Sequence, residues 1–380
     1  MATGFGPLTA RLKARAREAG FELAGVTTPE PSAHLEHYRR WVEAGMHGEM
    51  AYLARPDAIG RRASLEGTLA GVRSVVVVGH GYGQGGPAEE TEDLSQGVIA
   101  RYARGRDYHK VVKRKLQELA RWLEAEAPGG EHRAYVDTGP LLEREMARRA
   151  GLGWFGKNTM LIHPRRGSYF FLGVLLTTVE LEWDAPFEAD RCGSCTACLD
   201  ACPTGALLGR DDQGAPALDA RLCISYLTIE HRGAIAEPLR GRMGNRVYGC
   251  DICQEVCPWN SAKLVQVTGE RDYRPDWREA GDRAEAPGDL PGTESPSLVE
   301  LMRMTRDEWD VWTRGSAIRR AGYAGFKRNV AVAIGNWVTS TDGEPPEEAV
   351  AVLREALEDE EPLVREHAGW ALDRVGLDRA

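Results

Sequence analysis

The chain has 380 residues, of which 42% are hydrophobic and 28% are charged, and its formal net charge is −9. This length predicts two or three domains, each able to bury a core, and the negative charge excludes a surface that binds nucleic acid non-specifically over its whole extent. No apolar stretch reaches the ~18 residues of a membrane span, and the N-terminus lacks a signal-peptide pattern, so we expect a cytoplasmic protein whose eight cysteines do not form disulfides.

The first 185 residues alternate between helical and strand-like patterns, which is typical of an α/β or α+β domain. Amphipathic spacing and end signals predict helices at 8–19, 107–127 and 140–150. Apolar and β-branched runs predict strands at 21–27, 73–78, 98–102, 133–137, 160–163 and 168–178. We therefore expect residues 1–185 to form one α/β domain within an α+β protein.

The rest of the chain divides into three segments by composition. Residues 186–260 contain every cysteine, residues 261–297 are polar and rich in Pro, Gly and charge, and residues 298–380 have a helical pattern. The middle segment is typical of a linker or a long loop. In the last segment, FKRNVAVAIG and VREHAGWAL resemble each other at a spacing near the ~40-residue period of HEAT-type helical pairs. This predicts a HEAT-like domain, with an ordinary C-terminal helical cap as the alternative.

The spacing of the cysteines predicts two [4Fe–4S] clusters. The first run, C-x2-C-x2-C-x3-C before a proline, is that of bacterial ferredoxins, and the second is C-x2-C-x3-C before a proline with one cysteine upstream. In such pairs, three close thiolates wrap one cluster and the cysteine before the proline crosses to the other. The first cluster is therefore assigned to Cys192, Cys195, Cys198 and Cys257. The second is assigned to Cys202, Cys223, Cys250 and Cys253.

Other interpretations of the motifs fit less well. Structural zinc favours two separated CxxC pairs, which the third close cysteine and both Cys-Pro pairs oppose. GYGQGG and GLGWFG fit G-x-G-x-x-G, but neither has the strand-to-helix context of a nucleotide site. DYHKVV begins like the D-x-H-x-x-G motif that supplies a histidine to cobalt in some cobalamin proteins. Because Val112 replaces the glycine, a helix N-cap at Asp107 is the preferred interpretation.

Paired clusters of this kind relay electrons singly, and the flanking chain is too long for a ferredoxin alone. A wider resemblance supplies the missing activity: nearly the whole chain resembles the epoxyqueuosine reductase family. The matching segments are VDTGPLLEREMARRAGLGWFGKNTMLI, GSYFFLG, CGSCTACLDACPTGAL, CISYLT, GNRVYGCDICQEVCPWN and FKRNVAVAIGN.

The resemblance implies an iron–sulfur enzyme that also uses cobalamin. Such an enzyme removes the epoxide oxygen of epoxyqueuosine at the wobble position of tRNA and leaves queuosine. It implies a cobalamin-binding N-terminal domain without a histidine lower ligand, and a HEAT-like C-terminal domain that contacts tRNA. We expect electrons to pass singly through the clusters to cobalamin while an acid protonates the epoxide oxygen.

The resemblance also carries over residue roles. Asp137 in VDTG matches the proton donor, whose pKa we expect burial beside the corrin to raise. Without the resemblance, Asp137 would be interpreted as a helix N-cap. Cobalamin contacts are implied at Arg62, Ala100, Asp137, Lys157, Asn158, Ser168, Ser225, Cys250 and Asp251. Some relatives carry Cys at the position of Ala100, so a backbone contact is expected there.

Basic residues predict where tRNA binds. Residues 311–341 contain several basic side chains and no acidic residue, and phosphate contacts of this kind dominate nucleic-acid affinity. A solvated helical face is the alternative. With residues beside the second cysteine run, the expected tRNA contacts are Arg242, Asn245, Arg246, Arg314, Arg319, Arg320, Lys327, Arg328 and Asn329.

Three other functions compete with this interpretation. A reductive dehalogenase would share the cofactors but would carry an export signal and no basic tail. An electron-transfer module would hold no corrin, and a tRNA-binding scaffold would not change its bound tRNA. We expect an external electron donor of the reductase, ferredoxin or flavodoxin type, no membrane partner, and a monomer.

Overall fold

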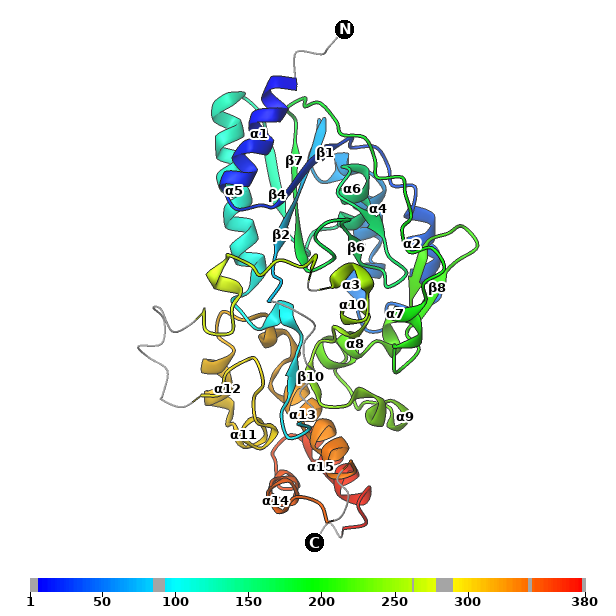
Figure 1. Cartoon of the computed structure of the whole chain (residues 1–380), viewed down its shortest axis with the longest axis vertical. Coiled ribbons are helices and arrows are strands. Elements are labelled where there is room, and N and C mark those ends of the chain that lie inside the picture. The colour runs from blue at the N-terminus through cyan, green and yellow to red at the C-terminus, as the bar shows by residue number, and fades with distance from the viewer. Residues whose placement is uncertain (1–5, 85–92, 262, 278–289, 341–343, 378–380) are drawn as a thin grey trace.

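The computed structural model describes residues 6–84, 93–261, 263–277, 290–340 and 344–377. Figure 1 shows an elongated molecule, with the sheet of the N-terminal part at one end, the C-terminal helices at the other and the cysteine-rich region beside their junction. The N-terminal helices are α1 (Gly6–Glu18), α2 (Leu35–Glu43), α3 (Ala51–Ala54), α4 (Pro56–Ala63), α5 (Tyr108–Glu126) and α6 (Glu143–Arg149). The strands are β1 (Leu23–Thr27), β2 (Ser74–Gly81), β3 (Val98–Ile99), β4 (His132–Tyr135), β5 (Trp154–Phe155), β6 (Leu161–Ile162) and β7 (Phe170–Thr177).

The main sheet has the order β1-β2-β7-β4, and each neighbouring pair is antiparallel. The expectation of an α/β domain is therefore wrong in this respect, because that class has mostly parallel strands. Val76 and Val78 pack with α1 and α5, whereas Val75 and Val77 pack with α6 on the other face. Burial of both faces explains why β2 is apolar at successive positions rather than at alternate ones.

Two features of the N-terminal part position residues of the candidate functional site. Asp107 caps α5 and accepts a hydrogen bond from the backbone N–H of His109, as predicted. The strand predicted at 98–102 covers only Val98–Ile99, because residues 101–103 turn into a 3-10 helix. That turn brings Tyr102 beside Tyr108, with 6.1 Å between their ring centroids.

The cysteine-rich region is made of short elements held by loops. Its helices and strands are α7 (Ala197–Asp200), β8 (Leu207–Arg210), β9 (Pro216–Leu218), α8 (Ile224–Ile229), α9 (Glu237–Arg240), β10 (Arg246–Tyr248) and α10 (Ile252–Glu255). Strand β10 pairs in parallel with β3, which joins this region to the N-terminal part. The cysteines of α10 therefore follow directly from a strand that is anchored beside residues 98–103.

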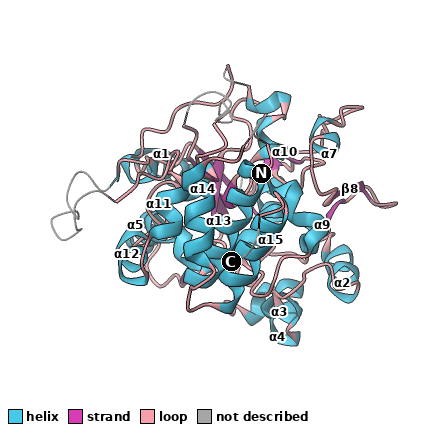
Figure 2. Cartoon of the chain, turned by 90° about the horizontal axis from the view of Figure 1, so that it is seen from below, coloured by secondary structure: helices cyan, strands magenta, loops and turns pink. Residues whose placement is uncertain are grey.

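The C-terminal part is helical, as predicted. It contains α11 (Leu298–Arg303), α12 (Arg306–Trp312), the 3-10 helix η9 (Ala317–Ala321), α13 (Tyr323–Val338), α14 (Glu347–Ala356) and α15 (Pro362–Asp373). Helix α13 is buried along nearly its whole length, and Figure 2 shows it among the other helices. The two segments that resemble each other lie on α13 and α15, which pack against each other; their assignment to HEAT-type pairs stays a prediction.

The segment predicted as a linker is packed against the N-terminal part where it is described. Val265 and Tyr273 belong to the core formed by α1, α5 and the sheet. The Tyr273 hydroxyl hydrogen-bonds Nδ1 of His80 at 2.7 Å. Residues 262 and 278–289 of the predicted linker, and the end of GYGQGG, lie outside the described residues. Within the described part of the chain, no helix is both long and apolar enough to cross a membrane.

Candidate active site and cluster-binding region

The first set of cysteines lies together as predicted. Burial, together with the charges of Cys257, Cys192 and Cys195, raises the pKa of the Cys198 thiol to about 11. Cys257 and Cys192 also pack with Trp154 and Trp259 in one apolar cluster. The thiols assigned to the first cluster are therefore neighbours, although they come from two distant runs. Cys257 and Cys192 lie in an apolar setting, whereas Cys195 is exposed.

The second set lies beside the first. Burial raises the pKa of Cys253 well above its ordinary value, and the next causes are the charges of Cys250 and Cys223. The charge of Cys202 acts in turn on Cys223. The charge of Cys198 also acts on Cys253, so the two sets adjoin. No three His, Cys, Asp or Glu side chains among the described residues are placed to hold a single metal ion, whereas a cubane needs thiolates spread around a larger body.

Polar side chains from the N-terminal part hold the cysteine loops in place. The Lys157 ammonium donates to the carbonyl oxygens of Gly193 and Cys195, at 2.8 Å and 2.9 Å. The Asn158 amide donates to the carbonyl oxygen of Cys253 at 3.0 Å. The Ser168 hydroxyl donates to Gln254 at 2.9 Å. Three residues predicted to contact cobalamin thus fasten the cluster loops to the β5–β6 region and to the start of β7.

Further predicted cofactor contacts lie along the same segment. The Ala100 N–H donates to the carbonyl oxygen of Tyr248 at 2.8 Å, and the buried Asp251 carboxylate accepts from the Arg101 N–H at 2.6 Å. The Arg101 guanidinium lies 5.1 Å from the centroid of the Tyr169 ring. The Tyr169 hydroxyl is buried and has no hydrogen-bond partner within the described part of the chain. An orphaned hydroxyl among these groups fits a site for a bound polar ligand.

Two other predicted contacts have different settings. Arg62 lies on α4, where it donates to the carbonyl oxygen of Ala58 at 3.1 Å and lies over the Tyr38 ring. Ser225 lies at the start of α8, where its backbone N–H points to the Cys223 thiol and lowers that thiol's pKa, against the larger effect of burial. Ser225 and Cys250 therefore belong to the surroundings of the second cluster.

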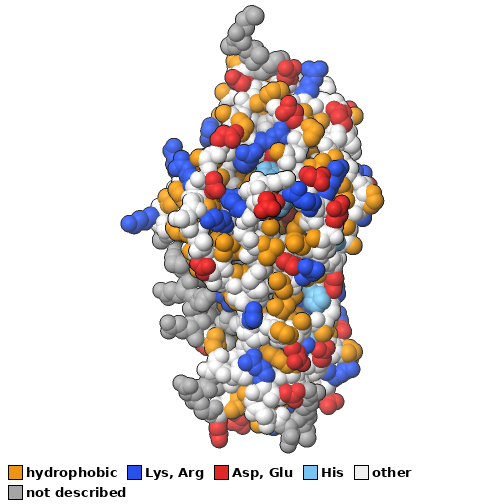
Figure 3. Space-filling view, turned by 90° about the vertical axis from the view of Figure 1, so that its right-hand side faces the viewer, with side chains coloured by type: hydrophobic (Ala, Val, Ile, Leu, Met, Phe, Trp, Pro, Cys, Tyr) orange, Lys and Arg blue, Asp and Glu red, His pale blue; other side chains and the backbone are white. Residues whose placement is uncertain are grey.

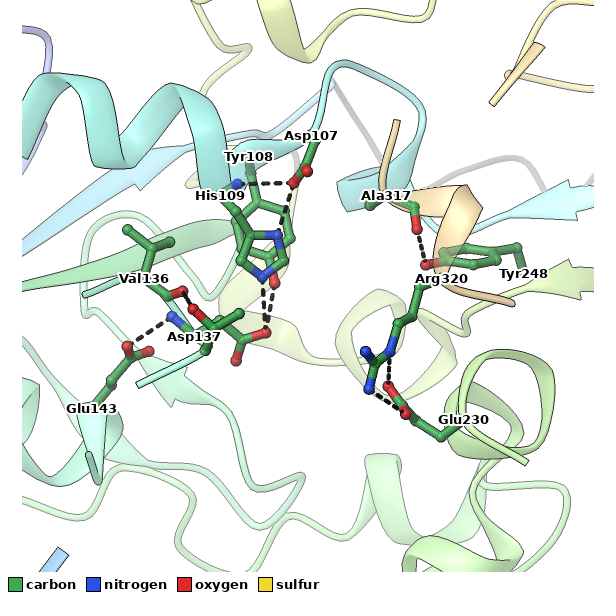
Figure 4. Close-up of polar contacts among 11 residues, drawn as sticks. Asp107, Tyr108, His109, Val136, Asp137, Glu143, Glu230, Tyr248, Ala317 and Arg320 are labelled. Carbon is green, nitrogen blue, oxygen red and sulfur yellow. Dashed lines mark hydrogen bonds and ion pairs between the residues drawn. The ribbon is translucent and has the colours of Figure 1, made fainter. Parts of the chain in front are cut away.

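The predicted proton donor, Asp137, lies between strand β4 and helix α6 and binds two side chains of α5 (Figure 4). The Tyr108 hydroxyl donates to Asp137 Oδ2 at 2.8 Å, and His109 Nε2 lies 3.4 Å from the same oxygen. The other ring nitrogen of His109 lies 2.8 Å from Asp107 Oδ1. Both nitrogens of His109 thus face carboxylates, and the ring is not presented as a metal ligand. Because α6 begins after Leu142, Asp137 is not a helix cap.

The protonation of this group differs from the expectation. Burial would raise the pKa of Asp137, but hydrogen bonds from His109 and Tyr108, with the charges of His109 and Arg144, outweigh it and lower the pKa. The side chain is 65% exposed, which weakens the effect of burial further. Burial would lower the pKa of His109, but its bonds to Asp107 and Asp137 raise it to about 9. At neutral pH the proton therefore resides on His109, and the expected raised pKa of Asp137 is wrong in this structure.

The Asp137 backbone is held in an uncommon conformation. Its φ of 57° lies in the left-handed region, which costs a residue with a side chain free energy. The Glu143 carboxylate accepts a hydrogen bond from the Asp137 N–H at 2.8 Å. Burial and the charge of Asp137 raise the pKa of Glu143 to about 8. Glu143 therefore secures the turn that presents the Asp137 carboxylate.

Part of the predicted tRNA surface is wrong, because three of its residues are interior. Arg328 is 0% exposed and donates to the carbonyl oxygens of Leu227, His231 and Gly233. Lys327 donates to the carbonyl oxygens of Met302 and Met304, and Asn329 donates to those of Thr228 and Val247. Basic side chains on a helix predict a surface face, but here they satisfy backbone carbonyl oxygens from within a buried helix.

The remaining predicted contacts divide by exposure. Asn245 and Arg246 are also buried, so their prediction as tRNA contacts is wrong as well. Asn245 donates to the carbonyl oxygen of Gln96 at 2.9 Å. Arg246 acts on Cys250, whose pKa its charge lowers against the larger effect of burial. The exposed members are Arg242, Arg314, Arg319 and Arg320. On the face shown in Figure 3, basic and acidic side chains are interspersed.

Comparison with protein families decides the assignment. Residues 191–260 match the family described as a 4Fe–4S double cluster binding domain, and residues 62–138 match the one described as epoxyqueuosine reductase QueG. The epoxyqueuosine reductase of Pseudomonas aeruginosa is 42% identical over 371 residues, which cover 97% of this chain and 95% of the relative. The chain belongs to the epoxyqueuosine reductase family. Its cysteine-rich region is a double [4Fe–4S] cluster domain, which replaces the zinc alternative.

Solved structures of this family share the fold. One of them is an epoxyqueuosine reductase with an epoxyqueuosine-modified tRNA-Tyr stem loop. It is 29% identical to this chain, with a TM-score of 0.81, and the match covers 97% of this chain and 90% of the solved chain. The enzyme of Bacillus subtilis, described with an aspartate catalytic loop swung out of the active site, is 28% identical, with a TM-score of 0.80 and coverage of 97% and 91%.

Sequence reasoning missed three residues of this epoxyqueuosine reductase site. The sequence predicts Tyr108 and His109 only as part of a helix that begins at Asp107, and Glu143 only as part of the helix at 140–150. The available signal was DYH at the start of a helix, together with a carboxylate between a strand and the next helix. Nothing in the spacing showed that these two helix starts face each other.

Proposed function

We propose that this chain reduces epoxyqueuosine to queuosine at the wobble position of tRNA. The observation that carries the proposal is an accessible carboxylate with a protonated histidine beside it, in the same fold as a double cluster domain. A reductase of this kind needs a source of single electrons and a proton donor. Relatives named epoxyqueuosine reductase match nearly the full length, which supports the choice of substrate.

The overall reaction converts an epoxide into an alkene and water, which consumes two electrons and two protons. His109 and Asp137 together hold one of these protons. As the C–O bond opens, the developing alkoxide takes a proton from this pair, with the proton moving from His109 to Asp137 as the substrate oxygen is protonated. Asp107 then stabilises His109 in the orientation that serves the transfer, and Tyr108 keeps the Asp137 carboxylate in place.

Cobalamin is the second cofactor of the proposal. When bound, it supplies low-potential cobalt chemistry at the epoxide carbon, while the clusters supply electrons one at a time. Groups proposed to hold it are Arg62, Ala100, Asp137, Lys157, Asn158, Ser168, Ser225, Cys250 and Asp251, and the orphaned Tyr169 hydroxyl lies among them. Since His109 is bound on both sides by aspartates, the cofactor is held without a histidine ligand from α5.

The substrate and the setting complete the proposal. Exposed Arg242, Arg314 and Arg319 contact the tRNA backbone, and phosphate contacts of this kind weaken as salt rises. Arg320 is also exposed, but it is paired with Glu230 and contacts the tRNA without binding a phosphate. We propose a cytoplasmic monomer, with a HEAT-like C-terminal domain, that receives electrons from a reductase, ferredoxin or flavodoxin. A single modified base must leave the anticodon stack to reach Asp137.

The test is anaerobic reconstitution with iron, sulfide and cobalamin, reduction, and incubation with tRNA that contains epoxyqueuosine. Mass analysis of the nucleosides is expected to show the loss of one oxygen atom. Protein reconstituted without cobalamin is the control and should give no product. An unchanged nucleoside in the complete mixture would reject the reductase assignment and leave an electron-transfer module.

A further inference from the structure

An exposed aromatic side chain lies near the carboxylate of the proposed active site. Tyr52, on the short helix α3, is 46% exposed, although most large hydrophobic side chains in the described residues are buried. The pKa of Tyr52 is raised by burial, then by the charge of Glu230, and also by the charge of Asp137; the charge of Arg320 lowers it. Contacts between aromatic rings connect the two places. Tyr108 binds Asp137 and lies 6.1 Å from Tyr102, which lies 6.2 Å from Tyr248. The Tyr248 hydroxyl donates to the Ala317 carbonyl oxygen in η9, the element that carries Arg320.

Tyr52 stands beside a guanidinium that is fixed in orientation. The Arg320 guanidinium lies 5.8 Å from the centroid of the Tyr52 ring. It makes a bidentate pair with the Glu230 carboxylate, with distances of 3.0 Å and 2.9 Å. Figure 4 shows this pair and Asp137 on either side of the centre of the view. Because Glu230 neutralises Arg320, the guanidinium offers little net charge to a phosphate, but its plane remains available for stacking.

The segments that carry these side chains are tied together. The Glu49 carboxylate accepts from the Arg232 N–H at 2.8 Å. The Arg232 side chain donates to the carbonyl oxygens of Arg320 and Ala321, at 2.9 Å and 2.7 Å. These hydrogen bonds connect the start of α3, the end of α8 and η9 in one polar network. Tyr52 therefore projects from a segment that is held in place and not from a free loop.

We propose that Tyr52 is the stacking surface for the planar base of the epoxyqueuosine nucleotide as it enters toward Asp137, with Arg320 holding the ring in orientation. This inference rests on the proposed function and adds a substrate-binding residue to it. A base that leaves the anticodon stack loses its neighbours, and an aromatic ring at the entrance replaces that stacking. The contact recognises the flat face of the base and not the phosphate backbone.

The first test compares Tyr52→Ala, Tyr52→Phe and Trp183→Ala in steady-state assays with epoxyqueuosine-containing tRNA. Trp183 is also exposed, at 52%, but lies next to Asp184, which pairs with Lys13 of α1. Since base–aromatic stacking is worth ~1–3 kcal/mol, we expect Tyr52→Ala to raise KM roughly 5- to 150-fold. Tyr52→Phe and Trp183→Ala should stay within about twofold of the parent protein. A Tyr52→Ala protein with normal KM and intact cluster absorbance would overturn the inference.

The second test measures stacking directly with a stem loop that carries 2-aminopurine at the wobble position. Binding of the parent protein and of Tyr52→Phe should quench its fluorescence, whereas Tyr52→Ala should bind with clearly weaker quenching. Equal quenching by Tyr52→Ala would overturn the stacking role. The two proposals fail differently: if the parent protein makes no queuosine, the reductase assignment fails, and if it does while Tyr52→Ala matches it, only the stacking role fails.

Discussion

At the scale of single residues, the site is a proton-holding pair and not an isolated acid. His109 lies between Asp107 and Asp137, and these contacts raise its pKa to about 9 while they lower that of Asp137. Burial beside a corrin would raise the pKa of Asp137 and keep its carboxyl group protonated. Hydrogen bonds to a carboxylate favour its charged form, and here they outweigh burial.

Asp137→Asn should abolish proton transfer while it keeps the shape of the side chain. An amide cannot pass a proton from His109 to the substrate oxygen, so we expect the single-turnover rate of reduced protein to fall about 10²- to 10⁴-fold. Asp212→Asn, an exposed change between β8 and β9, is the matched control. An unchanged rate in Asp137→Asn would remove this residue from the acid role.

His109→Gln should change how stability depends on pH. The folded pKa of His109, about 9, lies above the ordinary 6.5, so its contribution is complete below pH 6.5 and is lost as the pH rises through 9. We expect the free energy of unfolding of the parent protein to exceed that of His109→Gln by ~1–3 kcal/mol at pH 6. This difference should become smaller by pH 9.5. Anaerobic denaturation at several pH values measures this difference in unfolding free energy. A difference that does not change with pH would contradict the raised pKa of His109.

At the scale of elements, two helix starts and one buried helix position the chemistry. Helix α5 presents Tyr108 and His109, and α6 presents Glu143, which holds the Asp137 N–H. A relative in this family is described with its catalytic aspartate loop swung out of the active site. In this chain, Glu143 holds the turn at Asp137 with a hydrogen bond that either a carboxylate or an amide can accept.

Glu143→Gln should keep the turn and remove its pH dependence. The folded pKa of Glu143, about 8, exceeds the ordinary 4.5, so its stabilising contribution is present below pH 4.5 and is lost as the pH rises through 8. The melting temperature of the parent protein relative to Glu143→Gln should therefore decline from pH 5 to pH 8.5. Glu143→Ala should instead lower the single-turnover rate at every pH. A difference in melting temperature between the parent protein and Glu143→Gln that does not change with pH would exclude titration of Glu143 between pH 5 and pH 8.5.

Arg328→Met should destabilise the fold without changing the salt dependence of tRNA binding. The change leaves the carbonyl oxygens of Leu227, His231 and Gly233 without this donor, at a cost of about 2–4 kcal/mol. Arg314→Glu with Arg319→Glu is the surface counterpart, and should lower the slope of log affinity against log salt by roughly one per lost phosphate contact. An altered slope in folded Arg328→Met would return that residue to the tRNA surface.

At the scale of the whole molecule, local patterns could be predicted and long-range meetings could not. The spacing of the cysteines predicted that distant runs meet, because cluster geometry constrains which thiols can come together. The assignment of each thiol to a cluster stays a prediction. The start of α5 followed from Asp107, and β2 from its valines. The antiparallel order of the sheet did not follow, because the strands are separated by helices whose direction of return is not encoded locally. Burial of Arg328 depended on a partner 101 positions away, Leu227, and burial of Lys327 depended on Met302, 25 positions away.

The crossed pairing of the eight cysteines around two clusters is the claim on which the whole account depends. Quantification of iron and sulfide in anaerobically reconstituted protein tests it most directly, with Cys257→Ser and Cys253→Ser each removing a ligand from a different cluster. The account predicts about eight irons and eight sulfides per chain in the parent protein. In each variant it predicts the loss of roughly half of the iron and sulfide, or the conversion of one cluster to a form with fewer irons. Clearly fewer irons in the parent protein, or bound zinc in their place, would contradict it.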